Sequence, residues 1–177
     1  SNEQPSAGAA RGDLAEAQVE SIDYEGHGVA HIDGKAVFID GALPGETVLF
    51  RYHNKKKTHD TGRVVEVLHA SPDRVTPRCA HYGVCGGCSL QHLRSAAQLP
   101  AKQRVLHDAL TRIGRVQPQA WLAPLEGQPW GYRRRARLGV KLVAKKGGVL
   151  VGFREKHSSY VAVMDSCAVL PAHVSAL

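Results

Sequence analysis

The sequence predicts a mainly β protein with some α-helix, in which a five-stranded OB-like barrel over residues 13–70 precedes an α+β domain over residues 71–177. Three observations lead to this fold class. Short runs of apolar residues, separated by glycine-containing turns, fill the first part of the chain. Two prolines then bracket residues 71–77 and interrupt the last strand. Helical spacing of leucine and isoleucine appears only later, in residues 99–113.

Five segments of the first part are expected to form the strands of the barrel. The second and third are joined by Asp33-Gly34, which suits a type I′ hairpin turn because Gly tolerates a positive φ. The last two flank the tip NKKKTHD, which places Lys55, Lys56 and Lys57 side by side. Short strands of this number fit a small closed barrel, and such barrels often bind oligonucleotides through strand faces and loops. The strand segments are residues 17–23, 28–32, 35–39, 46–53 and 61–69.

The second part is expected to hold one helix and three strands. The helix over residues 99–113 has Pro100 in its first turn, where the missing N–H is tolerated, and Gly114 as its C-terminal stop. Residues 115–131 are rich in Pro and Gln and are expected to be irregular. The strands are residues 132–144, 147–155 and 160–167.

Arginines recur at every second position in the first of these strands, so a strand would direct their guanidinium groups to one face. The face is either a row of solvated side chains or a track for the phosphates of a nucleic acid. Residues 1–50 hold two basic and nine acidic side chains, whereas residues 51–177 hold twenty-one and seven. Such a segregated surplus indicates a polyanionic partner. The expected RNA-binding residues are therefore Lys55, Lys56, Lys57, Arg133, Arg135 and Arg137.

The four cysteines are unevenly spaced, because Cys79, Cys85 and Cys88 lie within ten residues and Cys167 follows after a long interval. Nothing in the chain argues for the oxidising compartment that disulfides need. A Cys₄ zinc site usually takes two close pairs such as CxxC, and only one close pair is present. An iron–sulfur cluster accepts three ligands from one loop and a fourth from a distant residue. From spacing alone, zinc and a [4Fe–4S] cluster both remain open.

Two glycines, Gly86 and Gly87, separate the close pair of cysteines. Without Cβ atoms they would let the loop turn tightly and direct backbone N–H groups toward the sulfides of a cluster. Four thiolates on four irons would leave no open coordination position, so such a cluster would be structural or redox-sensing.

These motifs resemble a known family. The segment CxxxxxCGGCxLQH, followed by YRRRARLGV, VGFRE and a late cysteine, is similar to the bacterial 23S ribosomal RNA (uracil-5-)-methyltransferases. The segment EGHGVAHIDGKAVFIDGALPGE and the lysine tip resemble the TRAM domain of the branch that carries an iron–sulfur cluster. The resemblance extends over residues 13–177, and CGGCxLQH is its most specific part.

The resemblance implies that Cys79, Cys85, Cys88 and Cys167 hold a [4Fe–4S] cluster. It also implies that residues 13–70 are a TRAM barrel and residues 71–177 an incomplete central RNA-binding domain. The parent enzyme would use S-adenosylmethionine to methylate C5 of a uridine in 23S rRNA.

The chemistry of the family uses a cysteine that adds to C6 of a flipped-out uracil, so that C5 can attack the sulfonium methyl group. A carboxylate base then removes the C5 proton. A C-terminal Rossmann-like domain supplies these groups, and no cysteine of this chain is left over for catalysis. The chain is therefore expected to be a catalytically inactive N-terminal fragment.

The remaining expectations concern the chain's ends, its location and the alternatives. Residues 1–12 are interpreted as the scar of a removed tag followed by a disordered leader. No apolar run approaches the roughly 20 residues of a membrane span and no signal segment is present, so a cytoplasmic protein without a membrane partner is expected. A stand-alone zinc-binding, RNA-binding module is the alternative function. A radical-SAM methylthiotransferase fragment would need a CxxxCxxC triad, which the chain lacks. The oligomeric state is left open.

Overall fold

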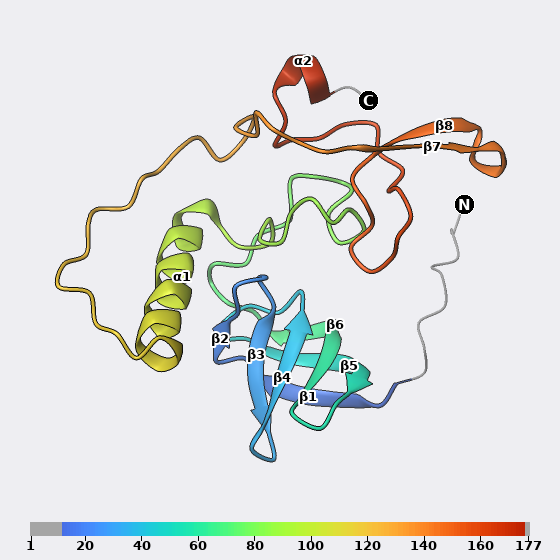
Figure 1. Cartoon of the computed structure of the whole chain (residues 1–177). Coiled ribbons are helices and arrows are strands. Elements are labelled where there is room, and N and C mark those ends of the chain that lie inside the picture. Colours follow the sequence, from blue (N-terminus) through green and yellow to red (C-terminus); the bar gives the residue numbers. More distant parts are fainter. Residues whose placement is uncertain (1–11, 176–177) are drawn as a thin grey trace. The chain divides into compact units, whose positions relative to one another are not determined.

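The computed structural model describes residues 12–175, so the expected tag scar and nearly all of the expected leader lie outside the described residues. The chain divides into two compact units, Ser1–Pro72 and Asp73–Leu177. Each unit is described here by itself (Figure 1).

The first unit is a six-stranded sheet in the order β1-β5-β6-β4-β3-β2, drawn in blue to green in Figure 1. Strands β4 and β6 are parallel, and the other neighbours are antiparallel. The six strands are β1 Leu14–Gln18, β2 Ser21–Ile22, β3 Gly28–Ile32, β4 Lys35–Asp40, β5 Thr47–Lys55 and β6 His59–His69.

The sheet has six strands, not the five expected, because the segment expected as one strand over residues 17–23 is divided between two partners. Val19 donates its N–H to the carbonyl of Glu46 at 2.8 Å, whereas the next residue, Glu20, donates to Val29 at 2.8 Å. The chain thus leaves β5 and joins β3 within one residue. Since β1 and β2 are the two edges of the sheet, this crossing brings the edges together and closes the barrel. The expected mainly β class is confirmed.

The interior of the barrel is aliphatic and aromatic, with Val37, Ile39 and Phe50 fully buried among other apolar side chains. Glu46 is also fully buried. Its carboxylate accepts the backbone N–H groups of Leu43 at 2.9 Å and of Ser71 at 3.1 Å, which offsets the cost of removing a charge from water. The carboxylate therefore holds the turn before β5 to the end of β6.

The hairpin turn between β3 and β4 has the expected geometry. Asp33 and Gly34 both have a positive φ, of 50° and 76°, as a type I′ turn requires. This tight turn sets the register in which Ile32 pairs with Lys35.

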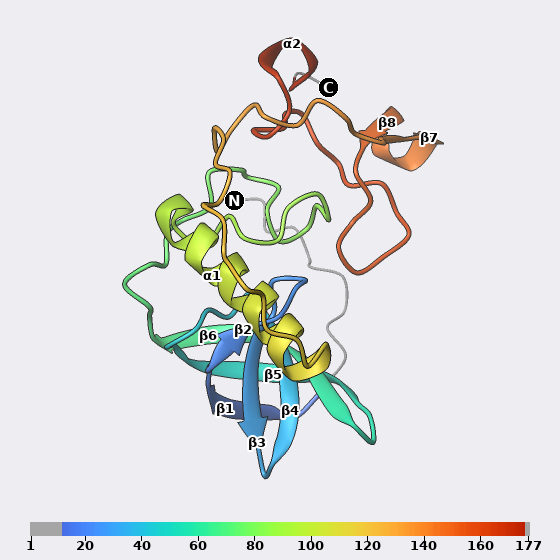
Figure 2. The same ribbon diagram turned by 60° about the vertical axis from the view of Figure 1, so that its left-hand side comes forward.

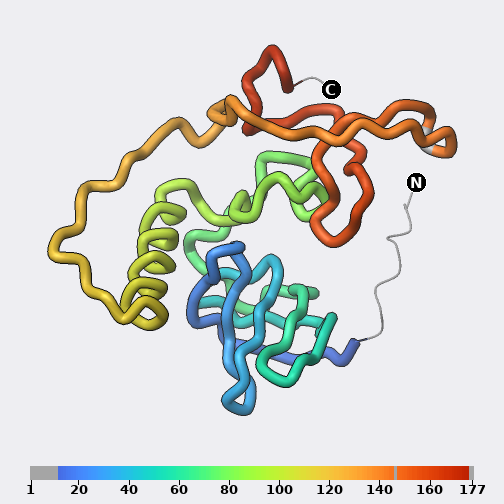
Figure 3. Tube along the Cα trace, viewed as in Figure 1, coloured from blue at the N-terminus to red at the C-terminus, as the bar shows by residue number. Residues whose placement is uncertain are grey.

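The second unit contains one long helix and one β-hairpin joined by irregular segments (Figures 2 and 3). The long connection over residues 115–138 is irregular, and its residues 115–129 are exposed. The regular elements are α1 Ser95–Asp108, a π-helical turn Ala109–Ile113, β7 Gly139–Val143, a 3₁₀ turn Ala144–Lys146, β8 Gly148–Gly152 and α2 Ala172–Ser175.

Helix α1 begins at Ser95 and not at Leu99 as expected. The preceding alanines favour helix, and the Gln98 amide donates to the carbonyls of Leu90 and Leu93 at 3.0 Å, which anchors the new first turn. Pro100 therefore lies inside the helix. Gly114 ends the helical segment as expected, and its N–H is bonded to the carbonyl of Ala109 at 2.9 Å.

The expected strands of this unit are shorter or missing among the described residues. Only Gly139–Val143 of residues 132–144 pairs in a ladder, because the preceding stretch follows the C-terminal segment instead: Arg133 donates its N–H to the carbonyl of Val169 at 2.9 Å. Residues 160–167 form no strand. They meet the chain after β8 through one isolated bridge, between Arg154 and Val161, which is flanked by two backbone hydrogen bonds. The expected strand of residues 147–155 is Gly148–Gly152.

Candidate metal centre and RNA-binding residues

The four cysteines lie on two segments of the second unit that are far apart in the sequence. Cys79, Cys85 and Cys88 belong to a loop of successive turns before α1, and Cys167 lies between β8 and α2. All four are free thiols. Cys85 and Cys167 are buried, whereas Cys79 and Cys88 are partly buried.

The structure brings these four residues together. Cys85 and Cys167 belong to one packed cluster of buried side chains, and Cys88 packs against it. Cys79 lies within electrostatic reach of both Cys85 and Cys88. The distant fourth cysteine therefore meets the loop that carries the other three.

The distances between the four cysteine sulfurs bear on which metal group could bind them. A tetrahedral zinc ion about 2.3 Å from each sulfur holds its ligands about 3.8 Å apart. Among the described residues, which include all four cysteines, no three of these sulfurs lie within 4.8 Å of one another. A cubane of four irons separates its four thiolates more widely than a single ion does.

Burial raises the pKa of the thiols of Cys85 and Cys88. For Cys85 the effect is partly offset by the N–H of Gly87, which donates to its sulfur at 3.4 Å, and increased by the neighbouring thiolates. For Cys88 it is partly offset by the side chain of Gln91 and by the positive charge of Arg133. Deprotonating several of these neighbouring thiols therefore costs free energy unless a cation binds among them.

The Gly86-Gly87 pair allows another segment to approach the loop closely. The N–H of Gly86 donates to the carbonyl of Arg154 at 2.8 Å, and a Cβ on Gly86 would lie 2.9 Å from the same oxygen. A Cβ on Gly87 would lie 3.0 Å from the ring of Phe153. Neither glycine has a positive φ. The two glycines are therefore needed for space beside residues 153–156, and of their two N–H groups it is that of Gly87 that points at a cysteine sulfur.

Three further hydrogen bonds fix the segment of Cys167. The carboxylate of Asp165 lies 2.7 Å from Nε2 of His81 in the cysteine loop, and hydrogen bonding to His81 lowers the pKa of Asp165. Ser175 accepts the N–H of Cys167 at 3.1 Å and donates to its carbonyl at 2.9 Å. Sequence reasoning missed these residues, since no local pattern indicates a pairing across such an interval.

The three alternating arginines do not share a strand face, because residues 132–138 form no ladder. Arg135 and Arg137 are exposed. Arg133 is partly buried, and its guanidinium donates to the carbonyl of Gly87 at 3.1 Å. Arg133 is thus a neighbour of the cysteine loop.

The lysine tip lies at the end of the β5–β6 hairpin in the first unit. Lys55 pairs with the carboxylate of Asp13 at 2.8 Å, and its ammonium group is 4.4 Å from the ring centre of Tyr52. The side chains of Lys56 and Lys57 are exposed. The tip therefore presents two lysines to solvent beside one that is held by the barrel.

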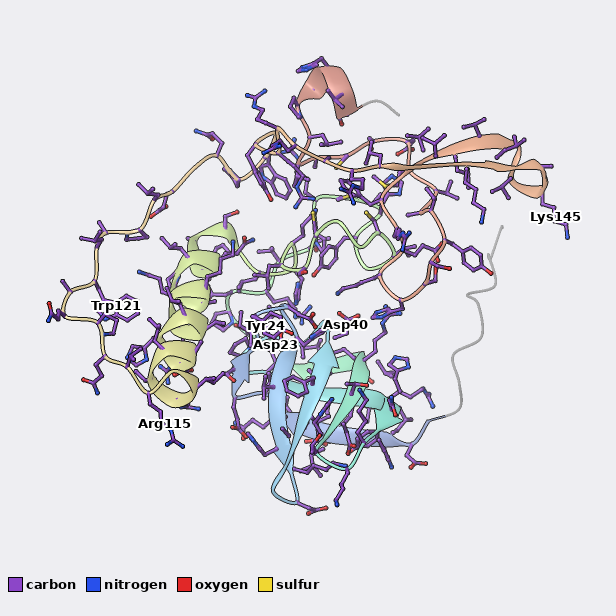
Figure 4. All side chains as sticks on the ribbon, in the orientation of Figure 1. Asp23, Tyr24, Asp40, Arg115, Trp121 and Lys145 are labelled. Carbon is purple, nitrogen blue, oxygen red and sulfur yellow. The ribbon has the colours of Figure 1, made fainter. Side chains whose placement is uncertain are left out.

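Exposed side chains of other kinds also occur at separate places on the second unit. Lys145 lies at the tip of the β7–β8 hairpin (Figure 4). Trp121, on the irregular connection, stacks on His107 of α1 with ring centres 5.8 Å apart. No residue of α1 is buried among the described residues.

Comparison with known proteins supports the resemblance expected from the sequence. The TRAM domain model matches residues 9–49. The chain is 55% identical over 161 residues to the 23S rRNA (uracil(1939)-C(5))-methyltransferase RlmD of Aromatoleum aromaticum, covering 91% of this chain and 37% of that protein. The RlmD of an Azoarcus species is 56% identical with the same coverage.

A solved structure has a similar fold. It is the tRNA (uracil-54, C5)-methyltransferase of Pyrococcus abyssi in complex with S-adenosyl-L-homocysteine, with a TM-score of 0.55 and 22% identity over 89% of this chain and 33% of that one. The resemblance to uracil-C5 methyltransferases is confirmed, and the chain spans about 37% of the length of the curated relatives. Within residues 12–175, none of the helices combines the length and apolar composition needed to cross a membrane.

Proposed function

We propose that this chain is the RNA-binding and iron–sulfur part of a cytoplasmic enzyme that methylates C5 of a uridine in 23S rRNA with S-adenosylmethionine. The observation that supports this most strongly is the convergence of four free cysteines from two distant segments, in a chain that resembles RlmD over nine-tenths of its length. The methyl transfer itself belongs to the rest of the longer polypeptide.

The residues proposed to hold a [4Fe–4S] cluster are Cys79, Cys85, Cys88 and Cys167. Their donor chemistry suits the group, because thiolates are the usual ligands of iron–sulfur clusters. Among the described residues no three of these sulfurs lie within 4.8 Å of one another, which supports a cluster over a single zinc ion. Bound there, the cluster would covalently join the loop before α1 to the segment before α2.

RNA contact is proposed for Lys55, Lys56 and Lys57 on the first unit and for Arg135 and Arg137 on the second. All five are exposed. Exposed basic side chains neutralise phosphates and release counterions, which makes binding dependent on salt. The sequence interpretation also placed Arg133 in this group, but its contacts lie within the second unit.

The enzymatic part of the proposal is tested with the full-length polypeptide and unmodified 23S rRNA. Radiolabelled S-adenosylmethionine should transfer its methyl group to C5 of a uridine, found as 5-methyluridine after nuclease digestion. The 177-residue chain alone should transfer no methyl group, because all four of its cysteines are proposed to hold the cluster and none remains to attack C6 of the uracil. Label on another atom, or on tRNA in preference to 23S rRNA, would contradict the proposed activity.

The metal part is tested by elemental analysis of the chain purified without oxygen. Iron and acid-labile sulfide in equal amounts, with absorbance across the visible range, are expected. One tightly bound zinc per chain and no iron would instead favour the stand-alone zinc module.

A further inference from the structure

Arg133 is held at three points by groups next to the cysteines. Its backbone N–H donates to the carbonyl of Val169 at 2.9 Å, two residues after Cys167. Its Nη1 donates to the carbonyl of Gly87 at 3.1 Å, one residue before Cys88. Its guanidinium carbon lies 5.6 Å from the ring centre of Phe153, which packs against the same cluster of buried side chains.

These contacts distinguish Arg133 from its neighbours. Arg134, Arg135 and Arg137 are all exposed, whereas Arg133 is partly buried. The guanidinium of Arg133 is hydrogen-bonded to the carbonyl of Gly87, so its positive charge lies beside the cysteine loop. A guanidinium that is partly shielded from water interacts with a nearby charge more strongly than a fully solvated one. The residue therefore reaches the candidate metal centre by both hydrogen bonding and charge.

From this geometry we propose that Arg133 is a positioning residue for the iron–sulfur cluster: it fixes the Gly86-Gly87 loop and compensates the negative charge of the loaded centre, so that it sets the reduction potential. This inference rests on the proposed function. Four thiolates around a cluster carry a net negative charge, and one-electron reduction makes it more negative. A nearby fixed positive charge stabilises the reduced form more than the oxidised form, which raises the potential.

Arginine suits this position for a second reason. Its planar guanidinium is always charged, can donate to a carbonyl and lies over an aromatic ring at the same time. Lysine would keep the charge but not the planar contact with Phe153. Comparing the two residue types therefore separates the effect of charge from that of shape.

The test uses the 177-residue chain purified and handled without oxygen. Iron and sulfide are first measured in the unsubstituted chain, and their absence would reject the proposed cofactor, independently of Arg133. The cluster is then reduced stepwise with dithionite, which supplies the electron, and the midpoint potential is read from electron paramagnetic resonance. Three variants are compared: Arg133→Gln, Arg133→Lys and, as a matched control for an exposed neighbour, Arg134→Gln.

Arg133→Gln is expected to disfavour reduction at least tenfold, which is about 59 mV toward negative potential for a one-electron couple. Arg133→Lys should shift much less, and Arg134→Gln should match the unsubstituted chain. An unchanged potential in Arg133→Gln, or an equal shift in the lysine variant, would overturn the role of charge. If Arg133→Gln retains no cluster, Arg133→Lys decides: a retained cluster of normal potential supports the inference, and a lost or shifted one overturns it.

Discussion

Replacing Gly86 by alanine tests whether the cysteine loop depends on close approach to the chain after β8. The added Cβ would lie 2.9 Å from the carbonyl oxygen of Arg154, closer than such contacts occur, and 3.4 Å from Cα of Lys156. Both atoms are backbone, so no flexible side chain can move aside. Gly86 does not have a positive φ, and the penalty therefore comes from space alone.

The expected cost follows from these contacts. One extra carbon forced into a packed site costs about 1–3 kcal/mol. The same shift lengthens the 2.8 Å hydrogen bond from the N–H of Gly86 to Arg154, which adds about 0.5–1.5 kcal/mol. The free energy of unfolding of the second unit should thus fall by about 1.5–4.5 kcal/mol, and about 1.4 kcal/mol is a factor of ten in the equilibrium constant.

Urea unfolding followed by tryptophan fluorescence measures this change. Both tryptophans of the chain, Trp121 and Trp130, lie in the second unit, and Trp130 packs against the buried cluster that contains Cys85. Gly127→Ala is the matched control, because no atom of the described residues lies within 4 Å of a Cβ at that position. The reasoning is refuted if the two variants unfold at urea midpoints that agree within error.

Three other variants test the first unit. Gly62→Ala would place a Cβ 2.6 Å from the ring of buried Phe50, so the barrel should lose about 1–3 kcal/mol of stability in urea unfolding followed by circular dichroism; an unchanged midpoint would contradict the packing. Burial alone would raise the pKa of Asp23, but hydrogen bonds from His27 and Glu25 lower it. Asp23→Asn should therefore reduce the free energy of unfolding by about 1 kcal/mol at pH 7. This difference between the two proteins should fade as the pH falls below about 3.9, because the native carboxylate then becomes protonated. A stability difference that grew as the pH fell would contradict the lowered pKa of Asp23. Replacing Lys56 and Lys57 together by Gln should reduce the slope of log affinity against log salt by about 2 for a 23S rRNA fragment in fluorescence anisotropy, and a constant slope would remove the tip from the RNA-binding surface.

Some features of the fold could be read locally and others could not. The Asp33-Gly34 hairpin depends on a dipeptide that accepts positive φ, and both residues adopt it. The break at Val19 and Glu20 arises because the N–H groups of these two residues bond to different partners, Glu46 and Val29. The residues themselves do not reveal this change of partner, so one strand was expected where two exist. Partner choice in a closed sheet is a property of the whole barrel and not of one segment.

The same distinction holds for the candidate site. The four cysteines could be singled out from composition and spacing, because a thiolate metal site needs cysteine residues whatever path the chain takes between them. The alternation of arginines suggested a common strand face, but Arg133 follows Val169 and Gly87, which are distant in the sequence. The close approach of Phe153 to Gly87 is likewise a product of tertiary packing.

The most direct test of the account is the iron content of four single variants, Cys79→Ser, Cys85→Ser, Cys88→Ser and Cys167→Ser, each purified without oxygen beside the unsubstituted chain. About four irons and four sulfides per unsubstituted chain are expected, with a sharp loss in every variant, including the remote Cys167→Ser. Full iron and sulfide in Cys167→Ser, with loss in the other three, would show that the distant thiol is no ligand and would contradict the single shared centre.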